Sequence, residues 1–221
     1  MFVDRLYYPV TTLGPGERIV VWTCGCTKHC PGCANPELWE TRPDAALPNE
    51  RVTELLLGVA ARTGAHRLTI TGGDPLEQAD DLAEVLTAIR PAFDDILVYT
   101  GFVLEDEALS SRGAPIGLLP PQTSLDGCSP STAGSLLRRR LPTALAPLID
   151  VIIDGPYVAA LNDGRCGLRG STNQRVIVRS PHLENLYHEE EQKPRRIQNA
   201  VFDGRALSIG IHGRPPKEER P

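Results

Sequence analysis

The sequence predicts an α/β fold with a mostly parallel sheet. Four short apolar segments rich in branched residues are predicted to be strands, and two helical patterns alternate with the first three. Near-continuous apolar runs of this kind are typical of strands buried on both faces, as in a parallel sheet covered by helices. At 221 residues the chain is long enough to bury a substantial core.

The predicted elements follow one another in a regular order. The expected strands are residues 18–23, 67–71, 96–100 and 150–154, and the expected helices are residues 50–62 and 76–90. The second helix places a set of apolar side chains on one face, namely Leu76, Ala79, Leu82, Ala83, Leu86 and Ile89. The order is therefore β-α-β-α-β, followed by an irregular stretch and a fourth strand.

The remaining segments carry weaker patterns. Residues 111–134 are dense in Gly, Pro and Ser and are expected to form an irregular insertion. The arginines at 138–140 are placed in the next helix, on a solvated face rather than a docking patch. Residues 189–196 are expected to form an exposed turn or loop, and residues 214–221 a disordered tail. One domain is predicted over residues 1–213.

Composition limits the partners. A net charge of −5 without a long basic stretch argues against nucleic acid. The amino-terminal residues do not resemble a signal peptide, and no run approaches the about 18 apolar residues of a membrane span. We therefore expect a cytoplasmic protein whose partner is another protein or a small molecule.

Three cysteines with the spacing C-x3-C-x2-C are the strongest chemical signal. Cys26, Cys30 and Cys33 stand in one short loop with Cys24 just before them, and such crowding favours metal chelation over disulfides. Iron-sulfur clusters normally take four cysteine ligands, so a set of three leaves a coordination site for a substrate or cofactor. The isolated Cys128 and Cys166 are expected to be ordinary thiols.

A structural zinc site is the alternative interpretation of these cysteines. Four cysteines can surround one zinc ion, but zinc ribbons usually bring together two separate C-x2-C pairs. Here Cys24 and Cys26 are separated by one residue, and there is no second pair. We expect Cys24 to end the first strand with its thiol facing the core.

Each predicted strand leads into a turn suited to ligand binding. The first enters the cysteine loop, and the others enter Gly72-Gly73-Asp74-Pro75, Gly101-Phe102 and Asp154-Gly155-Pro156-Tyr157. Parallel sheets place active sites at the carboxyl ends of their strands, so these turns are expected at one rim. Asp74 fits a helix N-cap with Pro75 behind it, whereas the paired glycines would let a ligand approach the backbone.

An ordered set of stretches gives the chain a wider resemblance. These are Tyr7-Tyr8-Pro9-Val10, Gly14-Pro15-Gly16, the loop from Gly25 to Cys33 with Asn35 to Trp39, Gly72 to Leu76, Tyr99-Thr100-Gly101-Phe102, Asp150 to Gly155, and Arg169-Gly170-Ser171-Thr172-Asn173-Gln174-Arg175. The chain resembles the radical S-adenosylmethionine superfamily, and within it the activating enzymes of anaerobic (class III) ribonucleoside-triphosphate reductase. The resemblance covers residues 7–175.

The resemblance implies a partial, splayed (β/α) barrel of five or six strands and a set of cofactor contacts. Cys26, Cys30 and Cys33 would hold a [4Fe-4S] cluster whose open iron binds the amino and carboxylate groups of S-adenosylmethionine. Gly72 and Gly73 would face the methionine moiety together with Asp74, which serves equally well as a helix cap. Gly32, Cys33 and Ala34 would lie beside the adenosine. Asn173 and Asp154 could touch the cofactor or build turns.

The chain departs from the wider pattern at the adenine contact. Many radical enzymes carry an aromatic residue immediately before the third cysteine, and the activating enzymes often carry one just after it. Here these positions are Gly32 and Ala34, so the residue that contacts adenine is left open. Lys28 and His29, inside the loop, either tune the cluster's potential or are exposed to solvent.

The function implied is the reductive cleavage of S-adenosylmethionine and the removal of a hydrogen atom from a glycine of a large partner. The expected partner is anaerobic ribonucleoside-triphosphate reductase, and the expected electron donor is of the flavodoxin or ferredoxin type. No catalytic side chain beyond the cluster and cofactor is expected. Two alternatives are a radical enzyme acting on a small molecule or peptide, with residues 111–134 as a lid, and a non-enzymatic iron-sulfur or zinc module.

Overall fold

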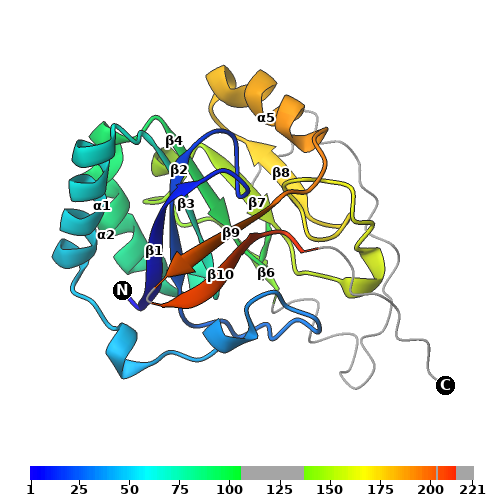
Figure 1. Cartoon of the computed structure of the whole chain (residues 1–221), viewed down its shortest axis with the longest axis horizontal. Coiled ribbons are helices and arrows are strands. Elements are labelled where there is room, and N and C mark those ends of the chain that lie inside the picture. The colour runs from blue at the N-terminus through cyan, green and yellow to red at the C-terminus, as the bar shows by residue number, and fades with distance from the viewer. Residues whose placement is uncertain (106–136, 203, 213–221) are drawn as a thin grey trace.

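A six-stranded sheet forms the centre of the computed structural model, which describes residues 1–105, 137–202 and 204–212 (Figure 1). The strands occur in the order β1-β2-β3-β4-β7-β8. Their bounds are β1 Val3–Val10, β2 Arg18–Thr23, β3 Arg67–Gly72, β4 Asp95–Tyr99, β7 Val151–Asp154 and β8 Arg175–Val178. The four strands expected from the sequence are β2, β3, β4 and β7, and each is confirmed to within one residue.

The sheet is mostly parallel. Strands β2, β3, β4 and β7 pair in parallel, while the edge strands β1 and β8 pair antiparallel to β2 and β7. The mixed α/β class is therefore confirmed. The barrel is not confirmed, because β1 and β8 form two separate edges and do not pair with each other in the described chain.

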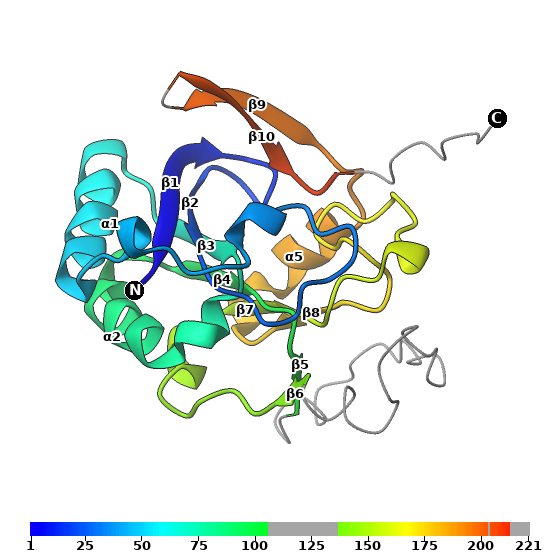
Figure 2. The same ribbon diagram turned by 90° about the horizontal axis from the view of Figure 1, so that it is seen from below.

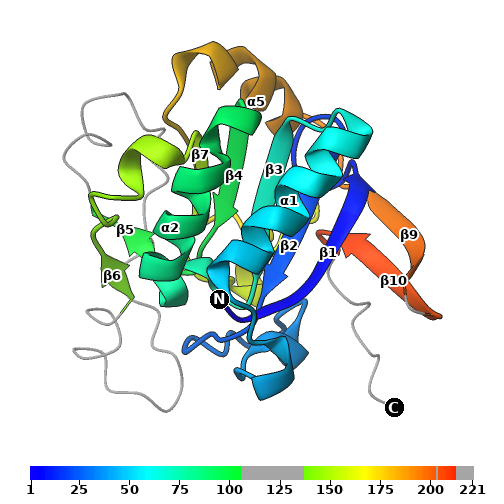
Figure 3. The ribbon, with the colours of Figure 1, turned by 90° about the vertical axis from the view of Figure 1, so that its left-hand side faces the viewer.

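Two long helices cover one face of the sheet (Figure 3). They are α1, Asn49–Thr63, and α2, Ala79–Ile89. Helix α2 begins three residues later than expected because Pro75–Gln78 forms a 3-10 turn, in which the Asp74 side chain accepts a hydrogen bond from the Leu76 amide. The apolar stripe of α2 packs with α1 and the alternate residues of β3 and β4 into the largest hydrophobic cluster.

The opposite face is covered by segments that the sequence did not predict (Figure 2). Helix α5, Glu184–Glu191, packs Tyr187 against β4 and β7, and Leu183 just before the helix joins the same cluster. The hairpin of β9, Ile197–Phe202, and β10, Arg205–Gly210, packs Ile209 against β1 and β2. The exposed loop expected at residues 189–196 is wrong in part, since α5 extends into it.

The arginines at 138–140 do not lie in a helix. Two of them form the short strand β6, Arg138–Arg139, which pairs in parallel with β5, Val103–Leu104. The Arg139 guanidinium donates a hydrogen bond to the Leu76 carbonyl at 2.6 Å and lies 5.0 Å from the Phe102 ring centre. The expected solvated helix face is therefore wrong, because tertiary contacts hold Arg139 beside the β3 and β4 ends.

The other described helices are short 3-10 turns. They are Pro36–Leu38, Pro43–Ala45, Arg90–Ala92, Ala146–Leu148, Ala159–Leu161 and Pro181–Leu183. None of the helices in the described chain has the length and apolar character needed to cross a membrane. Cys128, the predicted insertion at residues 111–134 and the predicted tail at residues 214–221 lie outside the described residues.

Candidate metal centre and cofactor cavity

The carboxyl ends of the four parallel strands meet at a cavity of about 440 Å³. Each strand end contributes to its lining, and the contributions include Cys26 after β2, Gly72 at the end of β3, Gly101 after β4 and Gly155 after β7. The sequence-based expectation that these turns share one rim is confirmed. The arrangement follows from the parallel register, which brings the ends of neighbouring strands to the same edge.

The three cysteines of the C-x3-C-x2-C loop all line this cavity. Cys26, Cys30 and Cys33 are partly buried free thiols. Cys24, by contrast, is fully buried in the apolar cluster that contains Trp22. Cys24 shares the buried face of Val20 and Trp22 and is not among the residues that line the cavity, so its thiol faces the core as expected.

Backbone amides surround the three cavity thiols. The backbone amides of Lys28 and His29 act to lower the pKa of the Cys26 thiol, and the amide of Tyr157 acts to lower that of Cys30. The Asn35 amide lies 3.4 Å from the Cys33 sulfur. Burial raises the pKa of the Cys26 and Cys30 thiols, and these amide donors oppose that rise by stabilising the thiolate.

The cysteine arrangement fits a cluster better than a single ion. In the described part of the chain, no three His, Cys, Asp or Glu side chains converge as the ligands of one metal ion must. A four-iron cluster instead takes each thiolate on a separate iron, so its ligands stand apart. Three thiolates with amide donors at the wall of an open cavity therefore fit an iron-sulfur cluster with one free position.

The paired glycines hold the β3 end against the cysteine loop. The Gly73 amide donates to the Thr23 carbonyl at 2.7 Å, and the Asp74 amide donates to the Gly25 carbonyl at 2.8 Å. A Cβ atom on Gly73 would lie 2.5 Å from the Gly25 carbonyl oxygen and 2.8 Å from that of Leu38. Glycine is thus required here for a close approach between two segments of backbone, and Gly72 and Gly73 also line the cavity.

Asp74 lies at the wall of the cavity with its carboxylate occupied by protein donors. It accepts hydrogen bonds from the Leu76 amide at 3.0 Å, the Thr100 hydroxyl at 2.9 Å and the Gly101 amide at 2.8 Å. Burial raises the pKa of Asp74, and the Lys28 charge and these donors oppose the rise. The expected helix cap is confirmed, and a direct contact of this carboxylate with a cofactor stays a prediction.

The side chain of Lys28 is buried, which excludes the solvent-exposed alternative for this residue. Only 2% of its side chain is accessible, and its ammonium lies 3.0 Å from Asp74 and 2.9 Å from Glu77. His29 is different, because its ring is about half exposed and stacks on Trp39 with 4.6 Å between the ring centres. The two residues of one loop therefore face opposite environments.

Asn173 and Asp154 take part in turn building. The Asn173 amide group donates to the Pro156 carbonyl at 2.8 Å. Asp154 accepts a hydrogen bond from the Leu104 amide at 2.8 Å and forms an ion pair with Arg175. Neither residue lines the cavity, whereas their neighbours Gly155, Gly170 and Gln174 do.

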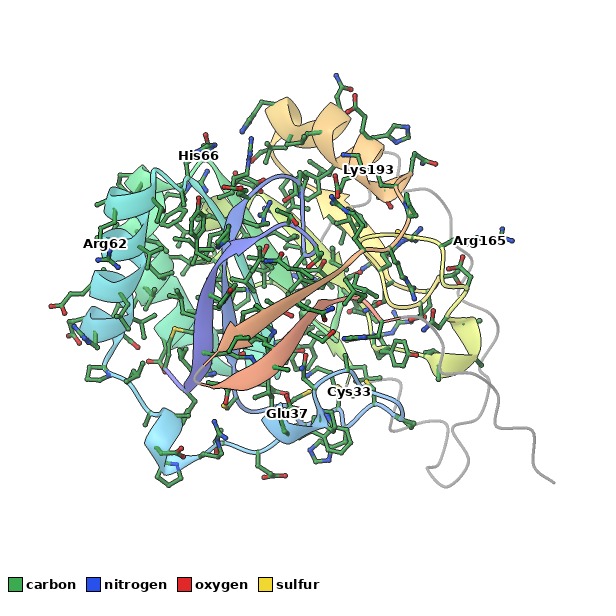
Figure 4. The ribbon with its side chains drawn as sticks, viewed as in Figure 1. Cys33, Glu37, Arg62, His66, Arg165 and Lys193 are labelled. Atoms are coloured by element: carbon green, nitrogen blue, oxygen red, sulfur yellow. The ribbon has the colours of Figure 1, made fainter. Side chains whose placement is uncertain are left out.

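Several lining residues were not found from the sequence. The cavity receives Arg5 from β1, Trp39 from the segment after the cysteine loop, and residues 207–212 from β10 and the segment that follows it. Cys33, which Figure 4 marks on the cysteine loop, lines the same cavity as this hairpin. Tyr157 also lines the cavity, and its place just after a strand end was a usable signal. For residues 207–212 there was none, because the hairpin reaches the site only through the tertiary fold.

The comparisons with known proteins agree with this description. Residues 12–115 match the family model described as a 4Fe-4S single cluster domain. Over 180 residues the chain is 32% identical to the anaerobic ribonucleoside-triphosphate reductase-activating protein of Enterobacteria phage T4, which covers 80% of this chain and 93% of that protein. The proteins of the same name from Escherichia coli (strain K12) and Vibrio cholerae are 27% and 26% identical over 77% of this chain and 94% of their own length.

Fold and cavity together define an α/β protein with a three-cysteine cavity at the carboxyl edge of a parallel sheet. The sequence identity to the relatives and the share of each chain that is covered assign the protein to a particular family. The chain belongs to the family of the anaerobic ribonucleoside-triphosphate reductase-activating proteins. This agrees with the resemblance drawn from the ordered sequence stretches.

Proposed function

We propose that this protein is a radical S-adenosylmethionine enzyme that generates a glycyl radical on anaerobic ribonucleoside-triphosphate reductase. The observation that carries the proposal is the placement of Cys26, Cys30 and Cys33 at the wall of a cavity formed by four parallel strand ends. The named activating proteins at up to 32% identity support it.

The thiolates of Cys26, Cys30 and Cys33 would bind three irons of a [4Fe-4S] cluster and leave the fourth for S-adenosylmethionine. When bound, the cluster supplies the electron that cleaves S-adenosylmethionine to methionine and a 5′-deoxyadenosyl radical, which removes a hydrogen atom from the partner's glycine. The amide donors to the three sulfurs orient the ligands and favour the thiolate form.

The rest of the cavity would orient the cofactor. Gly72 and Gly73 present backbone beside the cluster loop, and Asp74 fixes that backbone through its hydrogen bonds. Gly32, Cys33 and Ala34 would flank the adenosine. Holding the sulfonium in one geometry before electron transfer lowers the entropic part of the barrier.

The wider setting is also part of the proposal. We propose that residues 1–213 form one domain and that the open sheet is the partial (β/α) barrel of the superfamily. A flavodoxin- or ferredoxin-type protein would supply the electron. Free thiols and an open cluster require a reducing compartment, which favours the cytoplasm.

Electron paramagnetic resonance tests the proposal. The reconstituted, reduced protein is mixed with S-adenosylmethionine and the anaerobic reductase, and the expected result is a glycyl doublet together with 5′-deoxyadenosine. The Cys26→Ala variant should give neither product. Cofactor cleavage without a doublet would contradict the partner assignment and favour a small-molecule or peptide substrate. The lid that motivated that alternative, residues 111–134, lies outside the described residues.

A further inference from the structure

Lys28 joins the cluster loop to two other strand ends. It stands between the proposed ligands Cys26 and Cys30, yet its side chain is 98% inaccessible and extends away from the loop toward the ends of β3 and β4. There its ammonium pairs with Asp74 at 3.0 Å and with Glu77 at 2.9 Å. A buried lysine requires paired carboxylates of this kind, because an isolated charge is costly to remove from water.

The side chain of Lys28 is enclosed by contacts with the residues that follow β4. Its ammonium lies 3.4 Å from the centre of the Phe102 ring, a cation–π contact. A Cβ atom on Gly101 would lie 2.5 Å from the Cδ atom of Lys28, so glycine at this position makes room for the lysine stem. The Thr27 amide and hydroxyl bind the same Glu77 carboxylate at 3.1 and 2.6 Å, which anchors the loop at two successive residues.

Lys28 lies close to the proposed ligands. It is two residues from both Cys26 and Cys30 and lines the same cavity as these cysteines. Reduction adds one negative charge to a cluster held by those sulfurs, and a nearby fixed cation stabilises the reduced form more than the oxidised form. Burial strengthens this effect because solvent screens an enclosed charge poorly.

We propose that Lys28 is a positioning residue that fixes the cluster loop against the ends of β3 and β4 and raises the reduction potential of the cluster. This inference rests on the proposed function, since it takes Cys26, Cys30 and Cys33 as the cluster ligands. It adds a residue outside the ligand set whose charge makes the first electron transfer easier.

A redox titration of the reconstituted protein, followed by electron paramagnetic resonance with dithionite as reductant, tests the inference. The Lys28→Met variant should be harder to reduce, with an equilibrium constant for reduction lower by about tenfold, which is about 59 mV for a one-electron couple. Lys28→Arg keeps the charge and should recover most of the potential. The control Lys193→Met should match the wild type, because Lys193 is half exposed and pairs with Glu190.

A second variant covers the case in which Lys28→Met loses its cluster. Glu77→Gln leaves the lysine in place and removes one of its two paired negative charges, so the potential should rise. Full cluster content in Lys28→Met with an unchanged potential would overturn the inference, as would an unchanged potential in Glu77→Gln. The titration uses no reductase, so its result does not depend on the formation of a glycyl radical. A missing glycyl doublet in the experiment with the reductase would contradict the proposed function without changing the measured potentials.

Discussion

The guanidinium of Arg18 binds the carboxylate of Asp95 through two hydrogen bonds of 3.0 and 3.2 Å, with both side chains closed to solvent. Arg18 begins β2 and Asp95 begins β4, so the pair spans the intervening strand β3 at the amino end of the sheet. Tyr187 of α5 donates to the same carboxylate at 2.7 Å. The network holds three elements together at the end of the sheet opposite the cluster loop.

Removing Arg18 should therefore destabilise the fold. In Arg18→Ala the buried carboxylate of Asp95 loses both hydrogen bonds to its nearest cation and keeps only Arg67 at 3.9 Å, so the free energy of unfolding should fall by about 3–5 kcal/mol. Urea denaturation of the cluster-free protein measures it. The control Arg51→Ala removes an exposed pair with Glu54 and should cost less than about 0.5 kcal/mol. Equal losses in the two variants would contradict the role given to the buried pair.

The cysteine assignment predicts a division among the variants. Alanine at Cys26, Cys30 or Cys33 should sharply lower the iron bound after anaerobic reconstitution, because each change removes one ligand. Cys24→Ala should keep a full complement of iron, since its thiol is fully buried in the apolar cluster and does not line the cavity. Iron analysis and the absorbance of the cluster provide the measurement. Loss of iron in Cys24→Ala with retention in Cys26→Ala would require a different ligand set.

The glycine at position 73 should not accept a larger residue. In Gly73→Ala the new Cβ meets the carbonyl oxygens of Gly25 and Leu38, so the β3 end must move away from the cluster loop. We expect lower stability and weaker binding of S-adenosylmethionine. Gly58→Ala is the matched control, because it lies inside α1 and should stabilise the protein by about 0.5–1 kcal/mol. Denaturation measures the stability of both variants, and equilibrium dialysis with labelled cofactor measures their binding of S-adenosylmethionine. The same stability and binding in both variants would contradict the role given to Gly73.

Glu77 should give the protein a pH-dependent stability. Burial raises the pKa of Glu77, but hydrogen bonds from Thr27 and Lys28 outweigh it and leave the pKa below its usual 4.5. A carboxyl whose pKa is lowered by folding contributes stability above its unfolded pKa and loses it as the pH falls through the folded pKa.

The unfolding free energy of the cluster-free wild type should therefore decrease below about pH 4.5 relative to that of Glu77→Gln, which has no charge to lose at this position. Denaturant titrations of both proteins at a series of acidic pH values supply the comparison. Parallel pH profiles would show that the bonds from Thr27 and Lys28 do not favour the charged carboxyl.

The central strands of the fold could be predicted from the sequence because they are buried on both faces of the sheet. Strands β2 and β7 are buried at every position, so they appear as uninterrupted apolar runs. The edge strands β1 and β8 are only partly buried along most of their length, and such strands carry a mixed composition without a distinct pattern. The same reason applies to the β9–β10 hairpin, where Val201 is 75% exposed.

The candidate site was predicted where its residues are close in sequence. The cysteine spacing and the double glycine are local motifs, and the parallel topology brings them to one cavity. Lys28 could not be assigned in this way, since lysine is mostly a surface residue and its burial depends on Asp74 and Glu77, which lie 46 and 49 positions further along the chain. The hairpin wall of the cavity depends equally on distant contacts, such as the hydrogen bond from Thr12 to the Ile209 carbonyl.

The most direct test of the central claim is the electron paramagnetic resonance spectrum of the reduced wild-type cluster with and without S-adenosylmethionine. If Cys26, Cys30 and Cys33 leave one iron open for the cofactor, its addition should change the g values of the reduced cluster. A well-formed cluster whose spectrum is the same with and without saturating S-adenosylmethionine would contradict the open iron and the radical function derived from it.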